Sequence, residues 1–167
     1  SILPARHFPM PAGATAKLRR RKSGEAMRRL MQEMIVASRP QQTLYAALCA
    51  AADIYGRRRR LLEDVKQVEY SYNDLLKMAL MLGRQIEHLT EPGERVGLLL
   101  PNMVPTIGLI FGLSARRRIP AMLNYTAGVD AMQAACDAAE LKTVVTSRAF
   151  VEQAKLADKL AGLANVQ

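Results

Sequence analysis

The second half of the sequence alternates between short apolar runs and longer stretches of helical length. The candidate strands are residues 96–100, 119–123 and 143–146, and the candidate helices are residues 104–115, 126–140 and 149–160. A strand–helix–strand order with short connections is typical of a parallel sheet with right-handed crossovers. The sequence therefore predicts an α/β fold in which helices flank a three-stranded parallel core.

Residues 96–115 admit a second interpretation, because they contain no charged side chain and are long enough to span a bilayer. Gly108 and Gly112 also have the GxxxG spacing of paired membrane helices. However, Pro101 and Pro105 fall inside the stretch, and proline is poorly tolerated in a helix interior. A strand followed by a helix explains both prolines, so we favour it over a membrane span.

Upstream, a short helix and a hairpin are predicted. Thr43 is a candidate N-cap for a helix over residues 44–55, and Gly56 provides its stop. Residues 61–64 and 67–70 are two β-prone runs separated by a short turn. We therefore expect a helix followed by a β-hairpin.

A longer helix is expected after the hairpin. Ser71 and Asp74 have the spacing of a capping box at its start. The apolar side chains that follow recur at helical spacing and form one stripe: Leu75, Leu76, Ala79, Leu82, Ile86 and Leu89. Pro92-Gly93 then predicts a turn before the first strand of the sheet.

Positive charge is concentrated in the first third of the chain. Residues 1–60 carry 13 Lys and Arg against three acidic residues, whereas residues 61–167 carry 11 basic and 12 acidic residues. Within the basic part, residues 24–37 predict an amphipathic helix with the stripe Met27, Leu30, Met31, Met34 and Ile35. Residues 17–29 are a candidate for contact with an anionic membrane surface. A helix docked on a neighbouring domain explains the stripe without lipid, and we favour that interpretation of the stripe.

Nucleic acid is not an expected partner. Aromatic residues make up 5% of the chain and Trp is absent, so surfaces for base stacking are scarce. Arg57–Arg60 and Arg116–Arg118 each follow a predicted helix, where they interact favourably with the helix dipole. We interpret both runs as solvated turns rather than phosphate sites.

The motifs assign no catalytic, cofactor-binding or metal-binding residue. Neither His7 nor His88 is followed by the acid of a His-x4-Asp acyltransferase pair. Glycine-rich phosphate loops and clusters with metal-ligand spacing are also missing from the sequence. Cys49 and Cys136 lie among alanines, which predicts buried free thiols in a reducing compartment.

Four segments resemble the adenylate-forming superfamily, which includes acyl-CoA synthetases, luciferases and peptide-synthetase adenylation domains. They are Tyr70-Ser71-Tyr72, the run GERVGLLLPN at 93–102, the run IPAMLNYT at 119–126, and Val144–Ser147. In a parallel sheet, Pro101-Asn102 and Asn124-Tyr125-Thr126 follow strands that end at the same carboxyl edge. Ligands of α/β sheets bind at that edge.

A narrower resemblance covers nearly the whole chain. Residues 119–128, residues 146–150 and several front residues between 3 and 31 are similar to a bacterial family that joins an acyl-acyl-carrier-protein synthetase to a 2-acylglycerophosphoethanolamine acyltransferase. This resemblance implies that residues 1–40 are the acyltransferase tail with a basic helical connector. Residues 41–167 would be the incomplete N-terminal part of an AMP-binding synthetase domain.

The same resemblance implies a function for the longer enzyme, at the cytoplasmic face of the bacterial inner membrane. That enzyme uses ATP and Mg²⁺ to activate a fatty acid, passes it to acyl carrier protein and reacylates a lysophospholipid. The family's phosphate loop, acyltransferase pair and lid lysine have no counterpart here. Because these motifs are missing and the sequence begins and ends abruptly at Ser1 and Gln167, we expect a soluble fragment that is inactive alone. The alternative is a non-catalytic module that docks on a membrane or a partner.

Overall fold

The computed structural model describes residues 43–167, and the account that follows concerns those residues. They belong to one compact unit, Gln41–Gln167. The expected amphipathic helix at 24–37 and the candidate membrane-contact segment at 17–29 lie outside the described residues.

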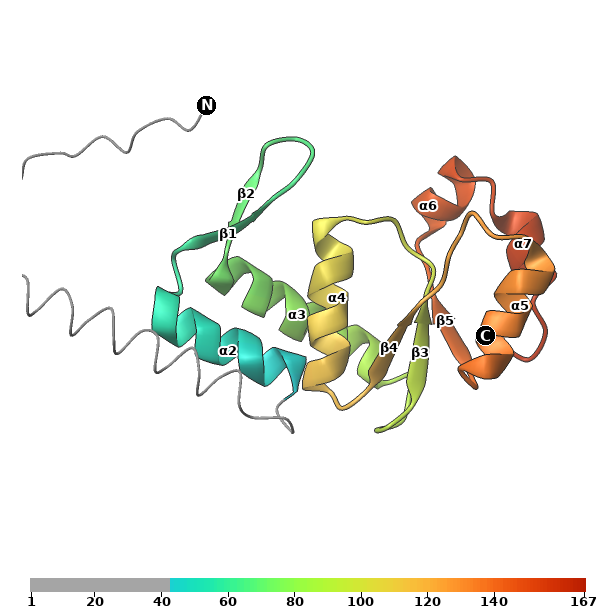
Figure 1. Cartoon of the computed structure of the whole chain (residues 1–167), viewed down its shortest axis with the longest axis horizontal. Helices are drawn as coiled ribbons and strands as arrows, with labels where there is room; N and C mark the ends of the chain where they lie inside the picture. The colour runs from blue at the N-terminus through green and yellow to red at the C-terminus, as the bar shows by residue number, and fades with distance from the viewer. Residues whose placement is uncertain (1–42) are drawn as a thin grey trace, which may run out of the picture. The chain divides into compact units, whose positions relative to one another are not determined.

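The described chain alternates helices and strands in the order that the sequence predicts (Figure 1). The elements are α2 (Leu44–Tyr55), β1 (Arg60–Glu63), β2 (Glu69–Ser71), α3 (Tyr72–Glu87), β3 (Arg95–Leu98), α4 (Val104–Ala115), β4 (Ile119–Met122), α5 (Val129–Ala138), β5 (Thr143–Val145), α6 (Arg148–Gln153) and α7 (Ala157–Ala161). β1 and β2 form an antiparallel hairpin, and the other three strands form a separate sheet.

The three-stranded sheet is parallel and has the order β4-β3-β5, so β3 is its central strand. Leu98 of β3 is in register with Met122 of β4 on one side and with Val145 of β5 on the other. α4 lies on one side of this sheet and α5, α6 and α7 lie on the other (Figure 1). The predicted α/β class with a parallel three-stranded core is therefore confirmed.

The central strand is buried on both faces, which explains why it reads as a continuous apolar run rather than as an alternating one. Val96 and Leu98 pack against Leu109 and Leu113 of α4. Leu99 belongs to the core on the opposite face, which contains Leu123, Met132, Cys136, Leu141, Phe150 and Leu156. Both cores thus meet at β3, and that strand fixes the helices of the two faces relative to each other.

The predicted caps are present at both upstream helices. The Thr43 hydroxyl accepts a hydrogen bond from the Ala46 amide at 3.1 Å, and Gly56 ends α2 with a φ of 97°. The Ser71 hydroxyl and the Asp74 carboxylate each accept a hydrogen bond from the other's backbone amide, which completes the capping box of α3. These contacts satisfy amide groups that have no partner inside the helix.

The alternative of a membrane span over residues 96–115 is wrong. β3 ends at Leu98 and α4 begins only at Val104, so the stretch is a strand, a loop and a twelve-residue helix. Within residues 43–167, no helix combines the length and hydropathy that crossing a bilayer requires. Gly108 is instead used for packing inside the unit, because a Cβ there would lie 2.7 Å from the Met78 side chain.

Leu89 was expected in the buried stripe of the long helix, and this expectation is wrong. α3 ends at Glu87, and the Leu89 side chain is 62% exposed in the loop that follows. The buried positions of α3 are Tyr72, Leu75, Leu76, Ala79 and Gly83. Gly83 is part of this face because α4 approaches α3 too closely for a side chain.

The single helix expected at 149–160 is also wrong, because the segment forms α6 and α7 with a break between them. Lys155 has a φ of 52°, which a continuing α-helix does not allow. The Leu156 amide donates to the Val151 carbonyl at 2.9 Å, and the Lys155 amide donates to the Glu152 carbonyl at 3.3 Å. This is a Schellman motif, and burial of Leu156 at its end compensates for the unfavourable φ of Lys155.

Candidate functional site

Three loops meet at the carboxyl edge of the parallel sheet. Residues 99–103 follow β3, residues 123–128 follow β4, and Thr146 and Ser147 follow β5. Because the three strands are parallel and adjacent, their carboxyl ends lie at one edge. The sequence expectation that Pro101-Asn102 and Asn124-Tyr125-Thr126 follow strands ending at one edge is therefore confirmed.

A pocket of about 620 Å³ lies at this edge, and we call it the edge pocket. Its fifteen lining residues come from α3, the loop after β3, α4, the end of β5, and α6 with its N-cap. The apolar lining includes Leu100, Pro101, Met103, Leu109, Val145 and Phe150. None of these fifteen described residues carries a charge, so the pocket suits an uncharged, mostly apolar ligand.

The hydroxyl groups in the lining are already used within the protein. The Thr106 hydroxyl donates to the Pro101 carbonyl at 2.7 Å, and the Thr146 hydroxyl donates to the Leu99 carbonyl at 2.8 Å. The Ser147 hydroxyl caps α6 by accepting a hydrogen bond from the Phe150 amide at 3.2 Å. These three hydroxyl groups are therefore engaged within the protein, and the remaining polar side chains of the lining are the amides of Gln85 and Gln153.

The loop after β4 supports the pocket from outside rather than lining it. The Asn124 side-chain oxygen accepts hydrogen bonds from the amide and the hydroxyl of Thr126, at 3.0 and 2.7 Å. Lys159 of α7 donates to the Tyr125 carbonyl at 3.0 Å and to the Ala127 carbonyl at 2.7 Å. In the loop held by these hydrogen bonds, the Tyr125 ring packs edge-on against the Phe150 ring, with 5.1 Å between the ring centroids. Phe150 in turn forms part of the pocket wall.

The first arginine run is a solvated turn, as the sequence analysis proposed. All four residues of Arg57–Arg60 are exposed. Arg57 pairs with Asp53 at 3.0 Å, Arg60 pairs with Glu69 at 2.6 Å, and Arg59 lies 5.3 Å from the centroid of the Tyr55 ring.

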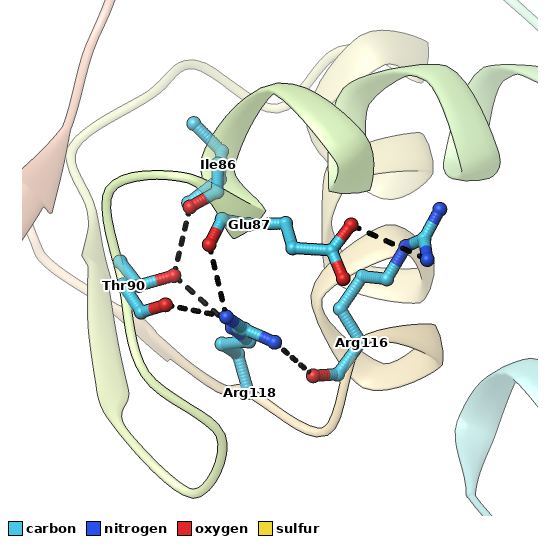
Figure 2. Close-up of polar contacts among 5 residues, drawn as sticks. All are labelled: Ile86, Glu87, Thr90, Arg116 and Arg118. Carbon is cyan, nitrogen blue, oxygen red and sulfur yellow. Dashed lines mark hydrogen bonds and ion pairs between the residues drawn. The ribbon is translucent and has the colours of Figure 1, made fainter.

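The same interpretation is wrong for the second run, because Arg118 is only 7% exposed. Figure 2 shows its guanidinium directed at Glu87, Thr90 and Arg116. Its guanidinium donates to the Arg116 carbonyl at 2.5 Å, to the Glu87 carbonyl at 3.1 Å, to the Thr90 hydroxyl at 3.1 Å and also to the Thr90 carbonyl. Thr90 donates in turn to the Ile86 carbonyl at 2.8 Å.

These bonds give the buried arginine a structural role. Glu87 and Ile86 are at the C-terminus of α3, where carbonyl groups have no partner inside the helix. Arg118 supplies the donors and ties this helix end to the turn between α4 and β4. Arg116, on the same turn, forms an ion pair with Glu87 at 3.3 Å.

The titratable side chains are distributed away from the edge pocket. Within residues 43–167, no three His, Cys, Asp or Glu side chains gather closely enough to hold a metal ion. His88 is the exposed C-cap residue of α3, as expected, and His7 lies outside the described residues. Cys136 is buried and Cys49 is half-buried, and both are free. Burial raises the pKa of the Cys136 thiol, which keeps it protonated and unreactive.

Sequence analysis did not identify most of the residues that line the pocket. Thr106, Phe150 and Gln153 belong to helices, and their helical spacing carried no functional signal. Gln85 lies on α3, whose contact with the sheet edge is a tertiary feature. The available signal was positional, since Pro101-Asn102 and Asn124-Tyr125-Thr126 were expected at the ligand edge because each follows a strand. Of these residues only Pro101 lines the pocket, and Thr146 and Ser147, which follow the third strand, were not singled out for that edge.

Comparison with known proteins places this geometry in a wider context. The AMP-binding enzyme family matches residues 50–167 of the chain. Among solved structures, VinN in complex with 3-methylaspartate aligns with a TM-score of 0.64 at 19% identity. The alignment covers 75% of this chain and 33% of VinN.

Two further structures have a similar fold. The N-terminal domain of FACL13 from Mycobacterium tuberculosis aligns with a TM-score of 0.62 at 18% identity, over 72% of this chain and 30% of that one. A protein described as a long-chain-fatty-acid CoA ligase from Rhodopseudomonas palustris aligns with a TM-score of 0.60 at 22% identity, over 77% and 32%. The chain thus spans about a third of the length of these structures.

Proposed function

The chain belongs to the AMP-binding enzyme family, and we propose that it forms the acyl-chain-binding part of an enzyme that activates a fatty acid with ATP. Its fold is that of the N-terminal subdomain of adenylate-forming enzymes. In the proposed reaction, a carboxylate oxygen of the fatty acid attacks the α-phosphorus of ATP. The bond from that phosphorus to pyrophosphate breaks, and an acyl adenylate forms.

The uncharged lining of the edge pocket is the observation that carries this proposal. Burying apolar surface contributes about 0.8 kcal/mol for each methylene group, so an alkyl chain gains affinity from such walls without any specific polar contact. A phosphate group would find no cationic side chain among the described lining residues. The pocket therefore supports binding of the hydrocarbon part of the substrate.

ATP and Mg²⁺ require other residues. The described lining of the edge pocket has no basic side chain for phosphates and no carboxylate for Mg²⁺. We assign both groups to segments outside the described residues. The further steps, transfer to acyl carrier protein and then to a lysophospholipid, rest on the narrower sequence resemblance. Contact of residues 17–29 with the cytoplasmic face of the inner membrane belongs to the same proposal.

Fatty-acid binding by the 167-residue chain tests the proposal directly. Equilibrium dialysis with radiolabelled octanoate should show saturable binding at one site. Met103 is 52% exposed and lines the edge pocket, so Met103→Glu places a charge at its wall without removing a core side chain. We expect this change to weaken octanoate binding by about tenfold, since a desolvated charge beside an alkyl chain is costly.

Met122→Glu is the matched control. Met122 is 49% exposed, lies on β4 and does not line the edge pocket. It introduces the same charge into the same unit, and octanoate binding should stay within about twofold of the original. Equal weakening by both variants, or no saturable binding by the unmodified chain, would contradict the proposed function.

A further inference from the structure

Lys159 of α7 is hydrogen-bonded to the loop that follows β4. Its ammonium group donates to the Tyr125 carbonyl at 3.0 Å and to the Ala127 carbonyl at 2.7 Å. Hydrogen bonds from a charged donor are stronger than those between two neutral groups. Lys159 therefore holds the loop firmly on both sides of Thr126.

The remaining hydrogen bonds of residues 124–127 are local. The Asn124 side chain accepts from the amide and the hydroxyl of Thr126, and the Ala127 amide donates to the Asn124 carbonyl at 3.2 Å. Bonds of this kind shape the turn, but they do not fix its position against the rest of the protein. Within residues 43–167, the hydrogen bonds that join this turn to a distant segment come from Lys159.

α7 gives Lys159 a fixed base. Leu156, directly before the helix, is 2% exposed, and Leu160 packs against the same core. The Leu160 amide donates to the Leu156 carbonyl at 2.9 Å. Just after the helix, a Cβ on Gly162 would be 2.9 Å from the side chain of Val129, the first residue of α5. The backbone at Lys159 therefore cannot shift without disturbing this core.

Tyr125 connects this loop to the edge pocket through Phe150. The two rings are nearly perpendicular, at 87°, and their centroids are 5.1 Å apart, a favourable arrangement for an aromatic pair. Phe150 is 8% exposed and lines the pocket, whereas Tyr125 is not among the described lining residues. The Ser147 hydroxyl anchors the Phe150 amide, but a backbone bond does not fix the orientation of the ring. Tyr125 therefore supports the Phe150 ring from outside the pocket.

We propose that Lys159 is a positioning residue for the edge pocket, because it holds Tyr125 against Phe150 and so fixes the wall that a ligand contacts. Lys159 does not line the pocket, so it acts on the ligand only through these two rings. A wall that is already in place spares the ligand the cost of ordering it, so loss of the Lys159 bonds should weaken binding. This inference rests on the proposed function and adds a residue outside the pocket that sets its affinity.

Octanoate binding to the full 167-residue chain, measured by equilibrium dialysis, tests the role of Lys159. Lys159→Met keeps much of the side-chain length and removes the donors, and we expect binding to weaken by about fivefold. Lys159→Arg keeps charged donors and should stay within about twofold of the original. Lys155→Met is the matched control, since Lys155 is an exposed lysine nearby that does not line the pocket, and it should also stay within about twofold.

A double-mutant cycle separates positioning from a general effect on the fold. Tyr125→Leu removes the ring that packs on Phe150 and should weaken octanoate binding about as much as Lys159→Met does. If Lys159 acts through Tyr125, adding Lys159→Met to Tyr125→Leu should weaken binding no further.

Additive losses in that cycle, unchanged binding by Lys159→Met, or an equal loss in Lys155→Met would overturn the positioning role. Octanoate binding and its loss in Met103→Glu would then still support the proposed function. If the unmodified chain does not bind octanoate, the proposed function fails and this inference fails with it.

Discussion

Gly112 of α4 lies directly against Gly83 of α3, so closely that a Cβ on Gly83 would be 2.6 Å from the Gly112 carbonyl oxygen. The relationship is reciprocal, because a Cβ on Gly112 would be 2.8 Å from the Gly83 amide nitrogen. Both obstacles are backbone atoms, which cannot rotate away as a side chain can. The two helices therefore cross at this point only because both residues lack a side chain.

Gly83→Ala should destabilise the fold strongly for this reason. Overpacking a well-filled core costs about 1–3 kcal/mol, and we expect the upper end because the neighbouring atoms are backbone. Urea unfolding followed by circular dichroism gives the change in unfolding free energy. Gly128→Ala is the control, since nothing lies within 4 Å of a Cβ there and its φ is −68°. A loss below about 1 kcal/mol for Gly83→Ala would show that the helices can separate at little cost.

The same contact shows what the sequence could and could not predict. The small-residue spacing at Gly108 and Gly112 entered the sequence analysis only as a feature of paired membrane helices, and a close helix–helix approach does exist at these glycines. Its partner is α3 of the same unit and not a second membrane helix. Spacing along one helix identifies a face that can be approached closely, but the identity of the opposing helix depends on tertiary structure.

The sequence predicted best those interactions whose two partners lie within a few residues of each other. The caps at Thr43 and Ser71 and the stop at Gly56 were predictable because each involves residues within a few positions. Burial of Arg118 was not predictable, because its acceptors at Glu87 and Thr90 are 31 and 28 positions away. The sequence predicted where a ligand pocket should lie, at the carboxyl edge of the sheet, but not which residues line it. Many of those residues belong to α3, α4 and α6, and no sequence motif indicates how these helices pack around the edge.

Arg118→Met should be among the most destabilising single changes in this unit. Methionine keeps much of the volume but removes every donor, so the Glu87 and Thr90 carbonyls lose a buried partner. Unsatisfied buried acceptors cost about 1–3 kcal/mol each, and we expect a total loss of about 3 kcal/mol in unfolding free energy. Arg117→Met, at the exposed neighbouring position, should change it by less than about 0.5 kcal/mol. Equal effects of the two variants in urea unfolding would rule out the capping role of Arg118.

Lys155→Gly should raise stability. Lys155 has a φ of 52° between α6 and α7, a conformation that costs an L-residue about 1 kcal/mol and glycine almost nothing. We expect an increase in unfolding free energy of up to about 1 kcal/mol, measured by thermal and urea unfolding. Lys155→Ala removes the same charge and keeps the Cβ, so it should give no increase. A similar gain in both variants would trace the effect to the lost charge.

Stability should fall on acidification partly through Asp74. Hydrogen bonds from the Ser71 hydroxyl and amide hold the pKa of the Asp74 carboxyl below its usual value. A carboxyl whose pKa is lower in the folded state stabilises the fold above its unfolded pKa, and this contribution is lost as pH falls through the folded pKa. The loss should therefore begin below about pH 4, near the usual aspartate value.

Asp74→Asn removes this titration and keeps a side-chain oxygen at the cap. The urea midpoint of this variant should depend less on pH between about 4 and 2 than that of the original chain. Asp130→Asn, in the first turn of α5, is the matched control, because it removes one carboxylate from another helix start and leaves the Ser71 hydrogen bonds in place. A pH dependence that survives Asp74→Asn in full would assign the acid sensitivity to other carboxylates.

Residues 17–29 should bind anionic membranes if the proposed location of the enzyme is correct. Each arginine near such a surface contributes about 1 kcal/mol, so vesicles rich in anionic lipid should sediment the chain at low salt and release it near physiological salt. Changing Arg19–Arg21 to Gln should reduce the bound fraction severalfold. The control changes Arg58, Arg117 and Arg148 to Gln, which removes the same charge from exposed positions elsewhere. If both triple variants bind equally, only net charge matters, and a specific membrane contact by residues 17–29 is excluded.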